Sequence, residues 1–133
     1  MSEIREGLMY STQHYWVELE NDNVARVGLT DFGQELLGSV TGVTLPTEGE
    51  SIDAETSVGE IEAADATEEL ISPISGTVIE VNEELSDSPS VINDEPYGDG
   101  WLYIVDLTDP DELNDLMDED AYGEFLEAEG EDE

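Results

Sequence analysis

The chain has 133 residues, and 2 basic side chains against 37 acidic ones give it a formal net charge of −35 at pH 7. The basic residues are Arg5 and Arg26, so the sequence contains no lysine, and it contains no cysteine either. This charge opposes binding to nucleic-acid phosphates, which depends on Lys and Arg, and docking on anionic membranes. Without cysteine there is no disulfide and no thiolate metal site. Without lysine there is no Schiff base, no P-loop lysine and no lysine-linked lipoyl or biotinyl group.

The length favours a single domain that can bury a core. Low hydropathy with high charge is typical of disorder, but 38% of the residues are hydrophobic and they stand in alternating runs. In 1 M salt the Debye length falls to about 3 Å, so the repulsion between the acidic side chains is mostly screened. The composition therefore indicates a globular protein adapted to concentrated salt. Residues 1–10 lack the apolar segment of a signal peptide, and no apolar run is long enough to span a bilayer. We therefore expect a cytoplasmic protein in a cell with a salty cytosol.

Alternating and β-branched residues predict a mainly β protein. We expect residues 1–9 to form a flexible lead-in, residues 10–126 the single domain and residues 127–133 an acidic tail. The predicted elements, in chain order, are strands at 15–19 and 24–29, a helix capped by Thr30 or Asp31, strands at 39–45 and 57–62, a small-residue tip at 63–67, a return strand that begins at 70–71, a corner at 72–76, a strand at 77–81, an irregular turn at 86–93 and a last strand at 101–105.

Capping signals mark the helices. Gln34 completes the capping-box spacing of the short internal helix, and Gly38 supplies a left-handed stop. Asp109 followed by Pro110 is typical of a helix start. The apolar residues of 122–126 continue the helical pattern, in a second helix or after a kink. The chain should therefore end in helices.

Acidic pairs carry little information about catalysis here, because they are everywhere and catalysis needs burial. No G-x-S-x-G motif and no phosphate-binding glycine motif is present. Asp118, Asp120, Gly123 and Glu129 have the spacing of a calcium loop, but Tyr122 stands where a further oxygen ligand is needed. We therefore interpret this segment as an acidic amphipathic helix.

His14 is the one histidine in the sequence. Next to Tyr15 and Trp16 it is either a buried, hydrogen-bonded structural residue or a metal ligand. We favour the first interpretation, because the chain offers no second nitrogen or sulfur ligand.

Eight short blocks of the sequence resemble, in order and spacing, the glycine cleavage H-protein family. They are His14-x-Trp16, Val27-Gly28-Leu29-Thr30 with Gln34 and Leu37-Gly38-x-Val40, Leu45-Pro46-x-x-Gly49, Gly59-Glu60-Ile61-Glu62, Ser72-Pro73-Ile74-Ser75-Gly76, Val81-Asn82, Val91-Ile92-Asn93 and Pro96-Tyr97-Gly98-x-Gly100-Trp101. The resemblance implies a lipoyl-domain-like β-sandwich or flattened barrel, the biotinyl/lipoyl hybrid motif, with a short internal helix and C-terminal helices.

The resemblance also implies a function. The family carries lipoate on one lysine at a hairpin tip, and the arm passes an aminomethyl group from the glycine decarboxylase (P-protein) to the aminomethyltransferase (T-protein). The dihydrolipoyl dehydrogenase (L-protein) then reoxidises the arm. Against the family pattern E-S-V-K-A, Glu62 matches the glutamate, Ala66 matches the alanine, and Asp65 stands in place of the lysine. A shift of one residue would place Ala64 or Ala66 there instead, and no shift supplies an amine.

Other family positions around the arm also differ. Tyr15 stands where the family has a glutamate between His14 and the tryptophan, Gln13 where a serine is common, and Phe32 where the family often has a histidine. Glu69 conservatively keeps an acidic residue shortly after the lysine position. The blocks of the scaffold are kept, while residues that handle the arm are changed.

These observations leave three hypotheses. The first is a non-lipoylated H-protein-like domain without its own catalytic site and without a cofactor, which acts as a scaffold, decoy or regulator toward P-, T- and L-proteins or lipoate-transfer enzymes. The second is a conventional H-protein that shuttles the aminomethyl group. The third is an unrelated acidic binding module. In each case we expect a monomer that binds neither nucleic acid nor membrane, and no metal.

Overall fold

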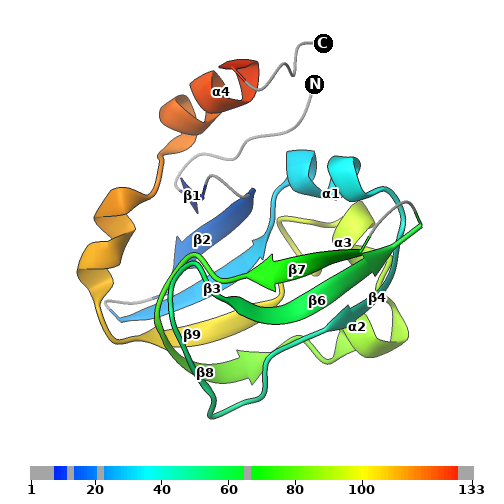
Figure 1. The fold of residues 1–133 in the computed structure, drawn as a ribbon, viewed down its shortest axis with the longest axis horizontal. Coiled ribbons are helices and arrows are strands. Elements are labelled where there is room, and N and C mark those ends of the chain that lie inside the picture. Colours follow the sequence, from blue (N-terminus) through cyan, green and yellow to red (C-terminus); the bar gives the residue numbers. More distant parts are fainter. Residues whose placement is uncertain (1–7, 12–13, 21–22, 65–66, 129–133) are drawn as a thin grey trace.

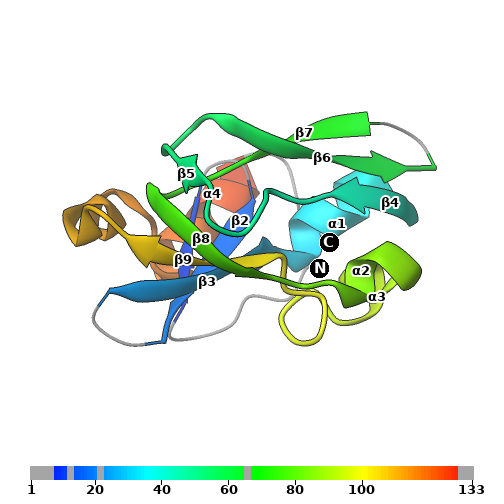
Figure 2. The same ribbon diagram turned by 90° about the horizontal axis from the view of Figure 1, so that it is seen from below.

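The computed structural model describes residues 8–11, 14–20, 23–64 and 67–128. Two antiparallel sheets lie face to face as a flattened sandwich, and α4 packs at one end (Figure 1, Figure 2). The elements are β1 Met9–Tyr10, β2 Tyr15–Leu19, β3 Val24–Leu29, α1 Asp31–Leu37, β4 Val40–Thr44, β5 Ser51–Ile52, β6 Ser57–Ala63, β7 Thr67–Ile71, β8 Gly76–Val81, α2 Glu84–Asp87, α3 Val91–Asp94, β9 Tyr103–Leu107, the 3₁₀ helix η1 Pro110–Asp115 and α4 Glu119–Ala128.

The larger sheet has six strands in the order β1-β2-β3-β9-β8-β5, and the smaller sheet has three in the order β4-β6-β7. Neighbouring strands are antiparallel throughout these two sheets. The predicted fold class, a mainly β sandwich with a short internal helix and C-terminal helices, is therefore confirmed, and the structure adds two further short internal helices, α2 and α3.

Strand alternation builds the core between the two sheets. Val17 of β2, Val27 of β3 and Val105 of β9 point inward from the large sheet, and Ile61 and Leu70 come from the small one. Side chains of this kind contribute about 1.5–3 kcal/mol each when they are fully buried. A second cluster on the other face of the large sheet consists of Tyr10, Trp16, Tyr122 and Leu126. It fastens α4 to β1 and β2.

The internal helix α1 follows its predicted signals. The Thr30 hydroxyl accepts a hydrogen bond from the Gly33 N–H at 3.0 Å, which caps the N-terminus. Gln34 donates to Asp31 at 2.8 Å. Gly38, at φ 83°, ends the helix in a conformation that suits glycine.

The predicted lead-in is wrong for Met9, which belongs to β1. Met9 pairs with Val17, and Tyr10 pairs with Trp16. Tyr10 is fully buried because its ring stacks on Tyr122 with centroids 4.5 Å apart. At the other end, residues 127 and 128 of the predicted tail belong to α4, and residues 129–133 lie outside the described residues.

Three segments in the middle of the chain also differ from the prediction. The return strand β7 begins at Thr67 rather than at residue 70, because the exposed Glu68 and Glu69 pair with β6 although they bury no side chain. Residues 86–93 were expected as an irregular turn, but α2 and α3 form there around the buried Leu85 and Ile92. The two-residue strand β5 was not predicted, because it is defined only by its pairing with β8.

The last strand β9 starts at Tyr103, two residues later than predicted. Trp101 and Leu102 are held by other contacts: the Asn82 amide donates to the Trp101 carbonyl at 2.8 Å, and the Leu102 N–H donates to Val27. The following helix begins at Pro110 as predicted, but it is the 3₁₀ helix η1, with the Asp109 carboxylate accepting from Asp111.

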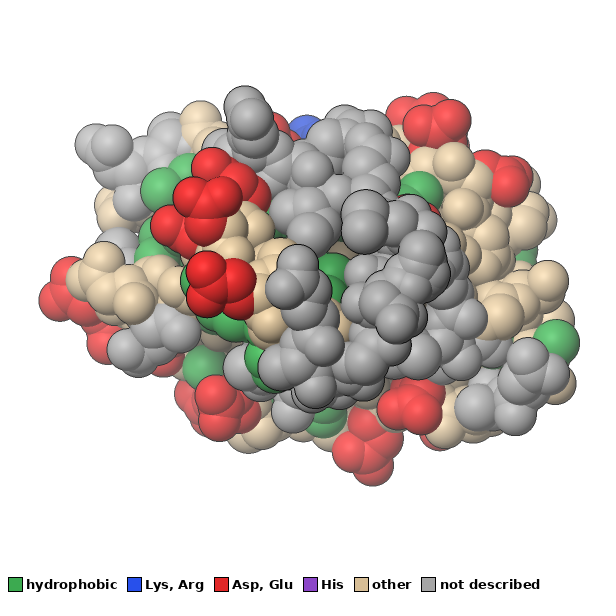
Figure 3. Space-filling view, turned by 90° about the horizontal axis from the view of Figure 1, so that it is seen from above, with side chains coloured by type: hydrophobic (Ala, Val, Ile, Leu, Met, Phe, Trp, Pro, Cys, Tyr) green, Lys and Arg blue, Asp and Glu red, His purple; other side chains and the backbone are tan. Residues whose placement is uncertain are grey.

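On the face shown in Figure 3, acidic side chains lie at several separate places. Among the described residues, Arg26 bonds to Glu20 at 2.9 Å. Within that same part of the chain, no helix is long and apolar enough to cross a membrane.

Candidate functional site

The hairpin of β6 and β7 carries the tip that the sequence singled out. Its last described pair joins Glu62 to Thr67, and the Ala64 N–H donates to the Ser39 carbonyl at 2.8 Å. Ala64 and Glu62 are both exposed. Asp65 and Ala66 lie outside the described residues. The structure therefore places the two flanks of the tip at the surface, beside the start of β4.

A cleft of about 430 Å³ runs beside β7, next to this hairpin. It is lined by Tyr15, Thr67, Glu68, Glu69 and Ile71. The structure thus brings together two positions predicted from the sequence, Tyr15 of β2 and Glu69 of β7, although 53 residues separate them in the chain. The carboxylates of this cleft belong to exposed residues, so water solvates them.

Tyr15 forms the inner wall of the cleft and bonds to the backbone of β7. Its hydroxyl accepts a hydrogen bond from the Ile71 N–H at 3.2 Å and donates to the Glu69 carbonyl at a longer 3.5 Å. The residue is only 4% exposed. Burial raises the pKa of Tyr15 to about 12, so the phenol is neutral at physiological pH. A neutral ring, tied to the edge strand, occupies the position where the family resemblance expects a carboxylate.

His14 lies apart from this cleft, although it precedes Tyr15 directly. Its Nδ1 shares a hydrogen bond with the Tyr122 hydroxyl at 2.9 Å, and its ring centroid lies 4.7 Å from that of Phe32. The Tyr122 hydroxyl also bonds to Thr30 at 2.8 Å. The structure shows a hydrogen bond of the kind the structural interpretation of His14 expects, but the residue is half-buried rather than buried.

The described residues contain no group of three or more His, Cys, Asp or Glu side chains arranged to hold a metal ion. The segment with calcium-loop spacing is helical, since α4 runs through Asp120 and Gly123, and Glu129 lies outside the described residues. Around the hairpin tip, the described side chains offer carboxylates, methyl groups and the hydroxyls of Ser39, Thr41 and Thr67. None of these forms the amide bond through which lipoate joins a protein.

The sequence did not predict the hydrogen bonds that join Tyr15 to the backbone of β7. The available signal was the aromatic residue itself, which stands between His14 and Trp16 where the family resemblance expects glutamate. The pairing of a β2 side chain with the open edge of β7 depends on how the two sheets are stacked, and no local pattern reports that.

The two-sheet sandwich with its exposed β6–β7 hairpin matches the lipoyl-domain-like class that the sequence indicates. Comparison with known proteins identifies the family. A solved glycine cleavage system H protein from Mycobacterium marinum superimposes with a TM-score of 0.84 at 34% identity, covering 96% of this chain and 100% of that one. The sequence model described as "Glycine cleavage H-protein" matches residues 8–129. The chain belongs to the glycine cleavage H-protein family.

Two curated relatives span nearly the same length. The glycine cleavage system H protein of Marinobacter nauticus is 43% identical over 129 residues, which cover 97% of this chain and 99% of the relative. The corresponding protein of Coprothermobacter proteolyticus is 42% identical over 123 residues, covering 92% and 97% respectively.

Proposed function

We propose that this chain is a glycine cleavage H-protein homologue that carries no lipoate and acts through its surface. The single observation that carries the proposal is the absence of lysine from all 133 residues. The family resemblance requires an amine at the hairpin tip, because lipoate is attached as an amide. Asp65 stands there instead, and its carboxylate cannot accept an acyl group in that way. Lipoate therefore does not fit the residues present.

The cleft beside β7 supports the same proposal. The Tyr15 hydroxyl occupies the hydrogen-bonding positions of Glu69 O and Ile71 N, and its ring replaces the glutamate that the family resemblance expects. A buried phenol with a raised pKa supplies no negative charge to a protonated amine at neutral pH. Asp65 and Tyr15 thus change the attachment point and the adjacent cleft together.

In this proposal the chain is a binding protein without a catalytic site of its own. Its partners are P-, T- or L-proteins of glycine cleavage, or lipoate-transfer enzymes, which it engages as a scaffold, a decoy or a regulator. We further propose that it is a monomer in a cytoplasm of high salt, where its 37 carboxylate side chains are screened.

The second candidate function is a conventional H-protein that shuttles the aminomethyl group. The similarity over the whole length of curated H proteins favours it. The two candidates differ in one respect that can be measured, namely whether the protein itself supports glycine cleavage.

The direct test is a glycine-cleavage assay in an extract deficient in H protein, supplied with lipoate and a lipoate ligase in molar KCl. A conventional H protein serves as the positive control. We expect the wild-type chain to restore no activity above the extract alone. Restored activity by the wild type would overturn the proposal and establish the conventional function.

A pull-down in molar KCl, with bound proteins identified by mass, tests the partner class. Recovery of the decarboxylase or the aminomethyltransferase is expected. Recovery of none of the glycine-cleavage or lipoate-transfer proteins would contradict the proposed partners, even if the chain carries no lipoate.

A further inference from the structure

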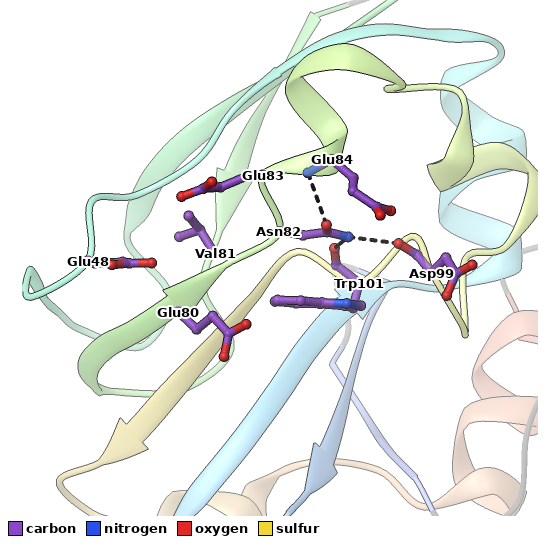
Figure 4. A pocket seen from close by; sticks show the side chains of 8 residues that line it. All are labelled: Glu48, Glu80, Val81, Asn82, Glu83, Glu84, Asp99 and Trp101. Carbon is purple, nitrogen blue, oxygen red and sulfur yellow. Dashed lines mark hydrogen bonds between the residues drawn. The ribbon is translucent and has the colours of Figure 1, made fainter.

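A concave pocket of about 440 Å³ lies at the end of β8, between the turn into α2 and the loop that leads into β9 (Figure 4). We call it the Trp101 pocket. Its lining residues are Glu48, Glu80, Val81, Asn82, Glu83, Glu84, Asp99 and Trp101. None of them belongs to the β6–β7 hairpin or to the cleft beside β7. The established family membership assigns no role to this pocket.

Acidity alone does not distinguish the pocket, because carboxylates cover this protein. The distinguishing feature is an indole ring in a hollow whose charged lining side chains are all acidic. The five carboxylates come from three separate segments of the chain: Glu48, Glu80, Glu83, Glu84 and Asp99. An aromatic face with surrounding carboxylates is the environment that attracts an organic cation.

Asn82 holds the pocket in shape. Its side-chain amide donates to the Asp99 carbonyl at 2.7 Å and to the Trp101 carbonyl at 2.8 Å, and its oxygen accepts from the Glu84 N–H at 3.3 Å (Figure 4). Asn82 is 5% exposed, so these bonds are sheltered from water. One side chain therefore joins the two segments that carry the indole and the carboxylates, and the pocket is formed before any ligand arrives.

The Trp101 ring already attracts one cation from within the chain. The guanidinium carbon of Arg26 lies 5.3 Å from the ring centroid. Arg26 belongs to β3 and is not one of the residues that line the pocket. This internal cation therefore does not fill the pocket.

We propose that the Trp101 pocket binds an arginine side chain presented by a partner polypeptide. The guanidinium stacks on the pocket side of Trp101 and donates hydrogen bonds to the surrounding carboxylates. Arginine fits better than lysine because its planar, weakly hydrated group stacks on aromatic rings and binds carboxylates with two parallel bonds. Contacts this short persist in molar salt, because the Debye length there is about 3 Å and the charges that are screened are those farther apart. This inference holds whether or not the chain carries lipoate.

The test uses the full-length chain in 1 M KCl and the peptide acetyl-Gly-Gly-Arg-Gly-Gly-amide. Its matched control replaces arginine by citrulline, which has the same shape without the charge. The readout is the NMR shift of the two indole N–H groups. Trp16 is the internal reference, because it is buried and its indole N–H donates to Pro96 at 2.8 Å. We expect the arginine peptide to shift the Trp101 signal and leave the Trp16 signal unchanged. An unmoved Trp101 signal, or an equal shift with citrulline, overturns the proposal.

Two sets of variants separate local binding from the general attraction of a protein with charge −35. The triple variant Glu80→Gln, Glu83→Gln, Glu84→Gln removes three pocket carboxylates, and Asp53→Asn, Glu60→Gln, Asp106→Asn removes three exposed ones elsewhere. By calorimetry we expect the pocket variant to weaken peptide binding about tenfold or more, and the control variant less than about twofold. Equal losses in both overturn the proposal.

The variant Trp101→Leu tests the stacked ring by the same calorimetry. We expect it to weaken binding of the arginine peptide by about threefold or more, because the stacked ring is removed while the carboxylates remain; an unchanged affinity overturns the proposal. The two triple variants keep the proposal falsifiable if Trp101→Leu does not fold.

Discussion

Tyr15 connects the two sheets at the cleft beside β7. Its ring comes from β2 of the large sheet, and its hydroxyl bonds to the edge of the small one through Glu69 O and Ile71 N. A strand edge is a place where another chain can pair. The phenol covers two of these backbone groups, so it strengthens the sandwich and limits what the cleft can hold.

The variant Tyr15→Phe tests this contact. It removes the hydroxyl and leaves the half-buried Ile71 N–H without its acceptor, so we expect the free energy of unfolding to fall by about 1 kcal/mol. Denaturant unfolding in high salt measures it. Tyr103→Phe is the matched control, because among the described residues the buried Tyr103 hydroxyl makes no hydrogen bond of ordinary geometry and has only a weak contact with Ser72. Removal of the Tyr103 hydroxyl should leave the free energy of unfolding unchanged or slightly higher. A larger drop in the free energy of unfolding for Tyr103→Phe than for Tyr15→Phe would contradict the role given to the Tyr15 hydroxyl.

Alkaline pH provides a second prediction for the same side chain. Burial raises the pKa of Tyr15 from 10.0 to about 12, so above pH 10 the unfolded chain releases a proton that the folded protein keeps. The stabilisation is complete below pH 10 and is lost as the pH rises toward 12, by about 2 to 3 kcal/mol for this residue alone.

The wild type should therefore lose stability in this pH range faster than Tyr15→Phe does. Denaturation curves at a series of alkaline pH values measure both slopes. Parallel slopes for the two proteins would show that Tyr15 does not titrate as described.

At the scale of elements, Asn93 of α3 joins the end of α1 to the start of β4. Its amide donates to the Gly38 carbonyl and to Gln34, both at 2.8 Å, and its oxygen accepts from the Val40 N–H at 2.8 Å. A single side chain thereby satisfies backbone groups where a helix ends and a strand begins. This contact holds α3, in a segment expected as an irregular turn, against α1 and β4.

Replacement of Asn93 by alanine leaves the Val40 N–H and the Gly38 carbonyl without their partners. We expect a loss of about 2 to 4 kcal/mol in the free energy of unfolding, measured by denaturant titration. Asn114→Ala, at an exposed site in η1, is the matched control and should change stability by less than about 0.5 kcal/mol. Similar losses in the two variants would refute the role of Asn93.

Elements with strong local signals could be predicted from the sequence, and elements defined by distant contacts could not. The strands β2 and β3 follow their alternation, and α1 follows Thr30 and Gly38 to the residue. In contrast, β5 exists only through its pairing with β8, and the position of β9 depends on the hold of Asn82 on Trp101. For the site, the sequence indicated Tyr15 and Glu69, but their meeting in one cleft required the stacking of the sheets.

At the scale of the whole molecule, the net charge of −35 dominates. Self-repulsion of this size opposes the compact state in dilute buffer, and salt screens it. We expect the melting temperature to rise steeply between about 0.1 M and 1 M KCl and to level off above about 1 M, where the Debye length is about 3 Å. Thermal unfolding followed by circular dichroism measures this. A melting temperature independent of KCl would contradict the adaptation to salt.

The proposed adaptation to salt would account for acidic residues in place of lysine over the surface, but it would not account for Asp65. A family that depends on one lysine would keep that position while its surface changed. The altered cleft at Tyr15 is consistent with a lost arm, because both changes affect the same hairpin region.

Intact-mass spectrometry after lipoylation tests the central claim most directly. Wild type and Asp65→Lys are each incubated with lipoate, ATP and a lipoate ligase in molar KCl, beside a conventional H protein as the positive control. The account predicts that the wild type keeps its unmodified mass, while Asp65→Lys gains the mass of one lipoyl group if the tip still fits the ligase. A wild-type chain that gains the mass of a lipoyl group would contradict the account.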